Sequence, residues 1–432
     1  MSFPTRGAAA AFFALALVFT VRAQEAAAAQ DNDLFSLHEH AAGGDAQAQF
    51  ALANCYYRGL DVAQDYGQAL FWYRKSAAQG FAPAQNQLGY MHQHKFGLPR
   101  DYKRALNYYR LAASKGYALA EYNLAAMYES GLWVKRDYKQ AFEWDRKAAD
   151  QSLPDAEEVV GYFYQWGLGV KRDYLQALTW YHRAADHGNS KAENQLGYMA
   201  ENGWGQPQSY NEAFSWYYKA ADDGSDEAME NIGYNFQNGI GVAVDYRQAR
   251  SWLYKAAALE NSDAENQLGW MYQFGQGVKS DDTKAVAWYR LAADQGNIHA
   301  KNNLHALKEE LEERGGGFWE SANQPVSDPA IEMVQRRARI RELRAQITGL
   351  ETDAVEEDNS ADQLAHMGDS GKKKNGGLAK AMDAFGTVAG VKPHLDAARS
   401  REEAARLRDQ LAKLEYLDQS SANVAGLPES AE

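Results

Sequence analysis

A period of 36 residues constrains this chain more than any other feature. When Asp45 is counted as position 1, position 4 is alanine in eight successive units, and position 28 is tryptophan or tyrosine in seven. No insertion breaks this register between residues 45 and 296. Such a strict period is typical of stacked helical repeats, because one unit cannot bury its apolar face alone whereas a stack can.

Each unit is predicted to form two helices. Positions 4, 8, 11 and 12 are mostly apolar, which is the spacing of one helical face. A glycine-rich loop follows, and a second helix is expected to begin at position 21, which is aspartate in six units and Ser209 in the fifth. Both residue types accept hydrogen bonds from the free N–H groups of a first helical turn. Small residues at positions 4, 9, 25, 32 and 33 allow the helices to approach closely.

The units resemble the Sel1-like repeat family, whose helix pairs are similar to tetratricopeptide repeats. The seventh unit carries the resemblance best, in Gln267-Leu268-Gly269-Trp270-Met271-Tyr272, Gly275-Gln276-Gly277-Val278, Ala285, Trp288-Tyr289 and Ala292-Ala293. It implies an all-α fold, a right-handed α/α superhelical solenoid of seven 36-residue helix pairs, and an adaptor role in protein complexes. The sequence departs from the pattern at His92-Gln93-His94-Lys95, at Ala200, at Gln206-Pro207, and at Glu260, where glycine is usual.

The rest of the chain is expected to cap and extend the solenoid. Residues 330–358 and 395–418 have apolar side chains at helical spacing and are coiled-coil candidates, which would pair with each other, dimerise the protein or dock a partner. The expected segments are a signal peptide at 1–23, a linker and capping helix at 24–44, the solenoid with a C-terminal capping helix at 45–312, a Gly/Pro linker at 313–329, an amphipathic helix at 330–358, a flexible Gly/Lys-rich linker at 359–394, an amphipathic helix at 395–418 and a disordered tail at 419–432.

Charge and the N-terminus limit the possible partners and compartments. A formal net charge of −13 disfavours general nucleic-acid binding. Arg6, the apolar residues 8–21 and the small residue Ala23 form a signal-peptide pattern, and no stretch is long enough for a transmembrane segment. We therefore expect an exported protein, periplasmic or secreted after cleavage near Ala23. Five arginines between 336 and 344 would either bind an anionic surface or form a solvated face balanced by Glu332, Glu342 and Glu351.

A partner-binding face is predicted on the first helices, opposite their core-facing stripe. Solenoids of this type present these helices on their concave side. Positions 6, 10 and 13 there carry amides and aromatic rings, which suit a peptide backbone and large contact surfaces respectively. The alternative is that the position-10 rings pack sideways against the next repeat. The predicted binding residues are Asn86, Tyr90, Tyr162, Asn194, Tyr198, Tyr234, Asn266, Trp270 and Gln273.

No motif predicts a catalytic residue, a metal site or a cofactor. The Gly-x-Gly pairs lack the third glycine and the preceding strand of a dinucleotide site, and they read as helix connectors. Ser370-Gly371-Lys372-Lys373 fits the Ser-x-x-Lys motif of penicillin-recognising enzymes, but no such scaffold surrounds it. His92 and His94 point to different faces of a helix, so packing is the preferred interpretation, and the lone Cys55 occupies a core position.

Three functions remain open at this point. The first is a non-catalytic exported scaffold for a protein or peptide partner. The second is a binding module for a cell-wall glycan or another envelope polysaccharide, which stacked tyrosine and tryptophan would also suit. The third is a cell-envelope hydrolase or β-lactam-binding protein. Self-association through the C-terminal helices is compatible with each of them.

Overall fold

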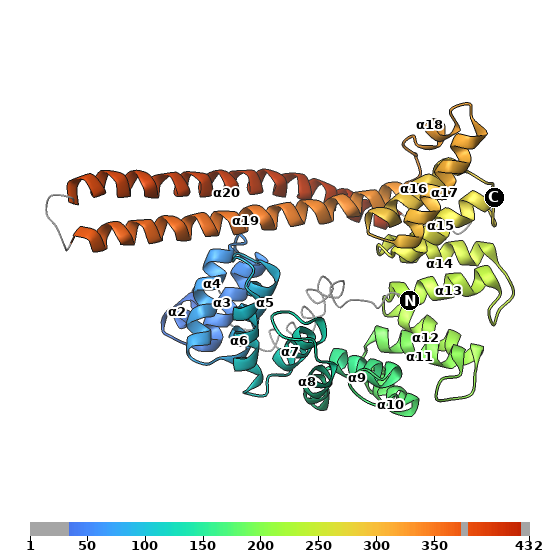
Figure 1. The fold of residues 1–432 in the computed structure, drawn as a ribbon, viewed down its shortest axis with the longest axis horizontal. Coiled ribbons are helices and arrows are strands. Elements are labelled where there is room, and N and C mark those ends of the chain that lie inside the picture. Colours follow the sequence, from blue (N-terminus) through green and yellow to red (C-terminus); the bar gives the residue numbers. More distant parts are fainter. Residues whose placement is uncertain (1–33, 373–378, 425–432) are drawn as a thin grey trace. The chain divides into compact units, whose positions relative to one another are not determined.

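The computed structural model describes residues 34–372 and 379–424, and side-chain positions within these ranges except at 358–395 and 420–424. Every regular element in them is a helix (Figure 1). The expected signal peptide at 1–23 lies outside the described residues. The first helices of the seven pairs are α3 (Ala46–Arg58), α5 (Ala82–His94), α7 (Ala118–Ser130), α9 (Pro154–Trp166), α11 (Ser190–Asn202), α13 (Asp226–Asn238) and α15 (Ser262–Phe274). The second helices are α4 (Tyr66–Ala78), α6 (Tyr102–Ala113), α8 (Tyr138–Asp150), α10 (Tyr174–Asp186), α12 (Tyr210–Asp222), α14 (Tyr246–Ala258) and α16 (Asp282–Asp294).

The chain divides into two compact units, which are described separately. Unit 1 contains residues up to 156, residues 168–170 and residues 345–408. Unit 2 contains residues 157–167, 171–344 and 409 onwards. Within each unit, consecutive helix pairs stack in chain order (Figure 1). The predicted all-α solenoid is therefore confirmed.

The second helix of a pair begins where the sequence predicts. The Asp65 carboxylate accepts a hydrogen bond from the Gln68 N–H at 2.9 Å, and Ser209 Oγ accepts one from the Glu212 N–H at 3.2 Å. These side chains satisfy backbone donors that a helix leaves free at its start. The first helices end in a left-handed residue, as at Gly203 with φ of 68°, whose N–H bonds to the Met199 carbonyl.

A tyrosine seated on a glycine brings the two helices of a pair together. In the second, fourth, fifth and seventh repeats, the tyrosine at position 29 of the second helix is fully buried, and its ring lies against the glycine at position 9 of the first helix. A Cβ atom added to Gly197 would lie only 2.6 Å from the Tyr217 ring, and similar contacts join Gly89 to Tyr109, Gly161 to Tyr181 and Gly269 to Tyr289. Glycine at position 9 is thus required by the close approach of the ring.

The hydroxyl of the same tyrosine bonds to position 13 of the first helix. Tyr217 donates to Glu201 at 3.1 Å and Tyr289 donates to Gln273 at 2.8 Å. In the first repeat, position 9 is Ala53, and the hydroxyl of Tyr73 bonds instead to Asn54 at 2.6 Å. The first repeat therefore differs both in the extra methyl group at position 9 and in the hydrogen-bond partner of the tyrosine.

A second polar couple joins the two ends of several repeats. Position 5, near the start of the first helix, meets position 35, just after the second helix. The couple is Gln79 donating to Gln49 at 2.9 Å in the first repeat, Gln151 to Glu121 at 2.7 Å in the third, and Gln295 to Glu265 at 2.8 and 2.9 Å in the seventh. The sixth repeat has Met229 and Leu259 there, so both members become apolar together. Buried polar atoms need partners, and this couple supplies them.

Capping elements close the two ends of the repeats. Helix α2 (Leu34–Ala42) packs on α3, within the segment expected to cap the N-terminus. At the other end, α17 (Ile298–Arg314) packs on α16 and buries Leu307 and Leu311. The expected Gly/Pro linker at 313–329 contains a short helix, α18 (Phe318–Ala322). Ile331 and Val334 join the same core cluster as Leu307 and Leu311, so the start of the next helix covers this end.

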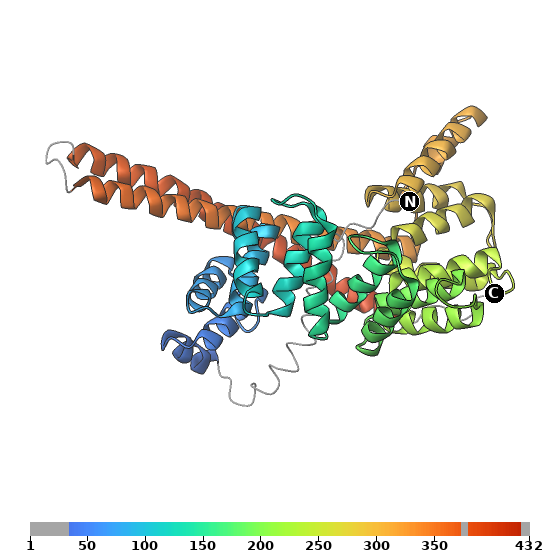
Figure 2. The ribbon, with the colours of Figure 1, turned by 60° about the horizontal axis from the view of Figure 1, so that its bottom comes forward.

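The C-terminal region forms two long helices, α19 (Pro329–Lys372) and α20 (Ala379–Val424), which run side by side in both views (Figures 1 and 2). Pairing is antiparallel and within the chain, since Arg344 of α19 bonds to Glu415 of α20 at 2.6 Å. Seven residues further along α19, Glu351 pairs with Arg408, which lies seven residues earlier in α20. Apolar and polar positions that recur every seven residues are typical of paired helices.

The expected flexible linker at 359–394 differs from the structure. This segment is helical up to Lys372 and again from Ala379, while 373–378 lies outside the described residues. Similarly, α20 continues to Val424, so the tail expected to be disordered from 419 begins as helix. The glycines of this stretch weaken a helix by about 1 kcal/mol each, but alanine is the best helix former and is frequent beside them.

The seat of the tyrosine on glycine predicts a sensitive site. We expect Gly197→Ala to lower the free energy of unfolding by about 1–3 kcal/mol, because the added methyl group overpacks the contact with Tyr217. Urea denaturation checks this value. In a Tyr217→Ala background the methyl group meets no ring, so the same substitution should then be neutral or stabilising, owing to alanine's better helix propensity. Equal losses in both backgrounds would contradict the packing explanation.

Burial of Glu265 predicts that stability depends on pH. Burial raises the pKa of Glu265 to about 8, the nearby Asp294 adds to the shift, and the amide of Gln295 opposes it. Between about pH 5 and 8 the folded chain keeps a proton that the unfolded chain releases, so the free energy of unfolding falls as pH rises, by up to about 1.4 kcal/mol per pH unit.

A glutamine in place of Glu265 tests this coupling, since the first repeat already has Gln49 at that position. Glu265→Gln should remove its part of the pH dependence and stabilise the protein most at pH 8–9, measured by urea denaturation at pH 5, 7 and 9. The exposed Glu212 provides the matched control, and Glu212→Gln should keep the wild-type slope. An unchanged slope in Glu265→Gln would show that this carboxyl does not titrate in the window.

Candidate functional site

The asparagines at position 6 join neighbouring repeats. Asn86 and Asn194 are buried, and Asn266 is half-buried. The side-chain oxygen of each accepts a hydrogen bond at 2.9 Å from an asparagine at position 7 of the following repeat, in the pairs Asn123–Asn86, Asn231–Asn194 and Asn303–Asn266. The structure therefore places these predicted binding residues in contacts between first helices.

The glutamine at position 13 is also engaged within the repeat. Gln273 is half-buried and accepts the hydroxyl hydrogen bond of Tyr289. Its amide is consequently oriented by the packing of the helix pair. Each of the predicted polar binding residues therefore forms a hydrogen bond with a neighbouring side chain.

The aromatic rings at position 10 lie at the surface to different degrees. Tyr234 is 44% exposed and Trp270 is 42% exposed, whereas Tyr90, Tyr162 and Tyr198 are half-buried. The ring of Tyr90 lies 4.3 Å from that of His94, in unit 1. Exposed apolar side chains that are scattered singly are common, whereas those that gather into a patch mark interaction sites. Position 10 is therefore the part of the predicted face that remains available in unit 2.

Sequence reasoning missed further rings in unit 2, at position 14 of the fourth and seventh repeats and at position 16 of the fifth. Trp166 lies 6.2 Å from Tyr162, and Phe274, which is 53% exposed, lies 4.3 Å from Trp270. Trp204 approaches both Trp166 at 5.7 Å and Tyr198 at 5.3 Å, linking the fourth and fifth repeats. The i to i+4 spacing was the available signal. We call this set the aromatic strip of unit 2: Tyr162, Trp166, Tyr198, Trp204, Tyr234, Trp270 and Phe274.

One acid–base contact arises that the sequence did not reveal. The fully buried carboxylate of Glu157 lies 2.6 Å from His187 Nδ1 and 3.0 Å from Arg183 Nη2. Glu157 and His187 occupy positions 5 and 35, where the first repeat has a pair of glutamines. Because an amide pair serves the same place, the contact is explained by packing of the repeat ends.

The histidines and the cysteine follow the packing interpretation in part. His92 is buried and stacked on Tyr108 at 5.8 Å, while burial lowers the pKa of His94 to about 4. Cys55 is half-buried, whereas Met91 and Met127 at the same position are fully buried. Within the described residues, no group of three or more His, Cys, Asp or Glu side chains is placed to hold a metal ion. The described helices also include none that is long and apolar enough to cross a membrane.

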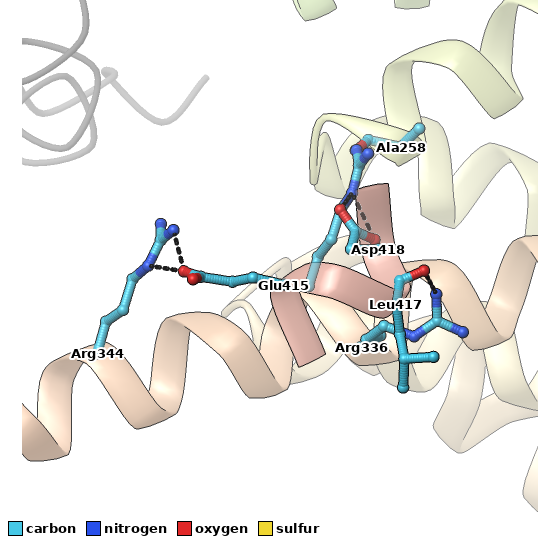
Figure 3. A network of polar contacts seen from close by, with 7 residues as sticks. Ala258, Arg336, Arg344, Glu415, Leu417 and Asp418 are labelled. Carbon is cyan, nitrogen blue, oxygen red and sulfur yellow. Dashed lines mark hydrogen bonds and ion pairs between the residues drawn. The ribbon is translucent and has the colours of Figure 1, made fainter. Parts of the chain in front are cut away.

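The basic run of α19 is engaged within the chain, as Figure 3 shows for part of it. Arg336 donates to the Leu417 carbonyl at 3.1 Å, Arg337 to Asp418 at 3.1 Å and Arg344 to Glu415 at 2.6 Å. Arg339 pairs with Glu342, and Arg341 pairs with Glu260. Of the acids expected to balance the run, Glu342 does so, whereas Glu351 pairs with Arg408 of α20.

Comparison with known proteins agrees with the repeat register. A family model described as the Sel1 repeat matches residues 46–81, 82–117, 118–153, 154–189, 190–225, 226–261 and 262–297. No curated protein matches the sequence.

Two solved structures are similar over long stretches. A protective antigen present in uropathogenic Escherichia coli strains, which displays an SLR fold, is 26% identical, with 93% of this chain and 99% of that chain covered and a TM-score of 0.53. A Sel1 repeat protein from Oxalobacter formigenes is 35% identical, with 63% of this chain and 79% of that chain covered and a TM-score of 0.52. The seven matches to the family model cover more than half of the sequence in the register of the helix pairs, and the chain therefore belongs to the Sel1 repeat family.

Proposed function

We propose that this chain is an exported, non-catalytic scaffold that binds a protein or peptide partner through the aromatic strip of unit 2. Sel1 repeat proteins are generally protein-interaction scaffolds. Such a role requires neither a β-strand nor a cofactor-binding fold. The observation that carries the proposal is the exposure of Tyr234, Trp270 and Phe274 on first helices whose opposite faces are fully buried. Aromatic side chains give large contact surfaces at low entropic cost and are enriched among the residues that dominate binding energy.

The chemistry around the strip supports binding more than catalysis. Each asparagine at position 6 accepts a hydrogen bond from an asparagine at position 7 of the next repeat, and the Glu157 carboxylate is engaged by Arg183 and His187. A general base must reach a substrate proton within hydrogen-bond distance, and a fully buried, doubly engaged carboxylate is poorly placed for that. A hydrolase or β-lactam-binding role therefore has less support than a binding role.

The aromatic strip predicts where partner binding is lost. In the variant Tyr198→Ala/Tyr234→Ala/Trp270→Ala, we expect partner affinity to fall by at least about thirtyfold, since truncation of such anchors typically removes 2 kcal/mol or more. Helicity measured by circular dichroism should stay at the wild-type level, because none of the three side chains is part of the buried core. Affinity capture from envelope and secreted fractions, followed by titration of the captured protein, measures the effect.

A control variant comes from exposed tyrosines outside the strip. Tyr210 and Tyr218 are 37% and 38% exposed on α12, and Tyr210→Ala/Tyr218→Ala should retain the partner. Equal capture by the strip variant and wild type would exclude this surface. Strip-dependent binding to purified cell-wall glycans, without a captured protein, would instead support the glycan-binding alternative, because sugar rings also stack on aromatic faces.

Export is proposed from the N-terminal sequence and has its own test. Expressed in a bacterium with its native N-terminus, the protein should leave the cytoplasm and begin at Gln24 after processing. Leu15→Arg interrupts the apolar run and should leave an unprocessed cytoplasmic chain, whereas Ala28→Arg lies beyond the cleavage site and should be exported normally. N-terminal sequencing of fractionated protein reads the outcome, and an unprocessed wild-type chain would contradict export.

A further inference from the structure

Two residues that replace a glycine at a left-handed turn also contact α19. Position 15 is glycine in six repeats and Lys95 in the second, and position 36 is glycine in five repeats, Ser152 in the third and Glu260 in the sixth. Lys95 and Glu260 both keep the left-handed backbone, with φ of 64° at each. Residues with a Cβ atom adopt this conformation at an energetic cost that glycine avoids. The described residues include three further non-glycine residues with positive φ, namely Asp61, Trp133 and Ser152.

In unit 2, the residue that replaces glycine contacts α19. The Glu260 carboxylate forms an ion pair with Arg341, and it is 24% exposed. Two residues earlier, the Ala258 carbonyl at the end of α14 accepts a hydrogen bond from Arg337, one helical turn from Arg341 on α19. Arg337 also bonds to Asp418 of α20, beside Ala258 (Figure 3). A helix C-terminus carries partial negative charge, which favours the two arginines at this place. With glycine at 260, only the Ala258 carbonyl would remain as an acceptor, because the Glu260 carboxylate would be absent.

In unit 1, the other replaced glycine also contacts α19. Thr352 is fully buried, and its hydroxyl donates to the Lys95 carbonyl at 2.9 Å and accepts from the Gly97 N–H at 3.1 Å. The Lys95 ammonium lies 3.8 Å from the carboxylate of Asp353. Val355 packs against the core cluster of the first two repeats. The turn after α5 is thus bound to α19 through backbone, charge and apolar contacts.

We infer that Lys95 and Glu260 are docking residues, at left-handed turns where most repeats have glycine, and that each binds a segment of α19 within its own unit. In unit 2 the turn at Glu260 binds the arginine-bearing residues 337–341 of this chain, and in unit 1 the turn at Lys95 binds its residues 352–353, a threonine and an aspartate. The C-terminal hairpin is accordingly a specific ligand of the repeats. This inference does not depend on the proposed partner-binding role of the aromatic strip.

Restoring the glycines separates docking from repeat stability. In the full chain, Glu260→Gly and Lys95→Gly should leave the melting temperature equal or higher, because the strained backbone is relieved. Amide hydrogen exchange of α19 should accelerate up to about fivefold, in residues 333–344 for the first variant and 349–356 for the second, as expected on loss of an ion pair near the surface. Exchange in the repeats themselves should remain unchanged.

Ser152→Gly is the matched control, because Ser152 occupies position 36 of the third repeat with φ of 59°. It should raise the melting temperature without changing exchange in α19. The charge-reversed pair Glu260→Arg/Arg341→Glu should restore the protection that either single reversal removes. Wild-type exchange of α19 in both glycine variants would overturn the inference, and so would equal acceleration in Ser152→Gly, since the effect would then come from the repeats alone.

Discussion

In four of the seven repeats, a tyrosine ring lies directly on a glycine of the facing helix, and this contact sets the packing of the helix pair. It fixes how closely the two helices of a repeat approach, and the hydroxyl of the same ring then reaches position 13. Once both are set, the first helices of successive repeats present the same faces to one another. These first helices also carry the asparagine pairs between repeats and most of the aromatic strip of unit 2.

Much of the fold could be predicted because its determinants are local. Asp65 and Ser209 specify helix starts through hydrogen bonds to residues three positions away, and the glycines specify left-handed ends. The C-terminal region was less predictable, because whether two helices pair within a chain or between chains depends on contacts distant in sequence. The hydrogen bond between Arg344 and Glu415 joins the two helices within the chain. The sequence around either residue does not indicate that they are in contact.

The candidate site was predicted only in part, for a similar reason. Asn194 lies opposite the core-facing stripe of its own helix, so the helix alone places it at the surface. The next repeat covers that side, and the side-chain amide of Asn231 donates a hydrogen bond to the side-chain oxygen of Asn194. Tyr234 and Trp270, by contrast, remain exposed. The position-14 rings were overlooked because only some repeats have an aromatic side chain there. A position that varies between repeats does not stand out when the repeats are compared.

The asparagine pairs also affect how such an array can change by recombination. The pairs at positions 6 and 7 are not all alike, since the sixth repeat offers Glu230 to Gln267 of the seventh. A deletion of whole repeats that brought Asn86 opposite Asn231 would join two amides that match. A deletion of the sixth repeat alone would set Asn194 against the longer Gln267, in a space shaped for another pair. Gain and loss of repeats in such a gene is therefore restricted to junctions at which the side chains of positions 6 and 7 match, even though every unit has the same length.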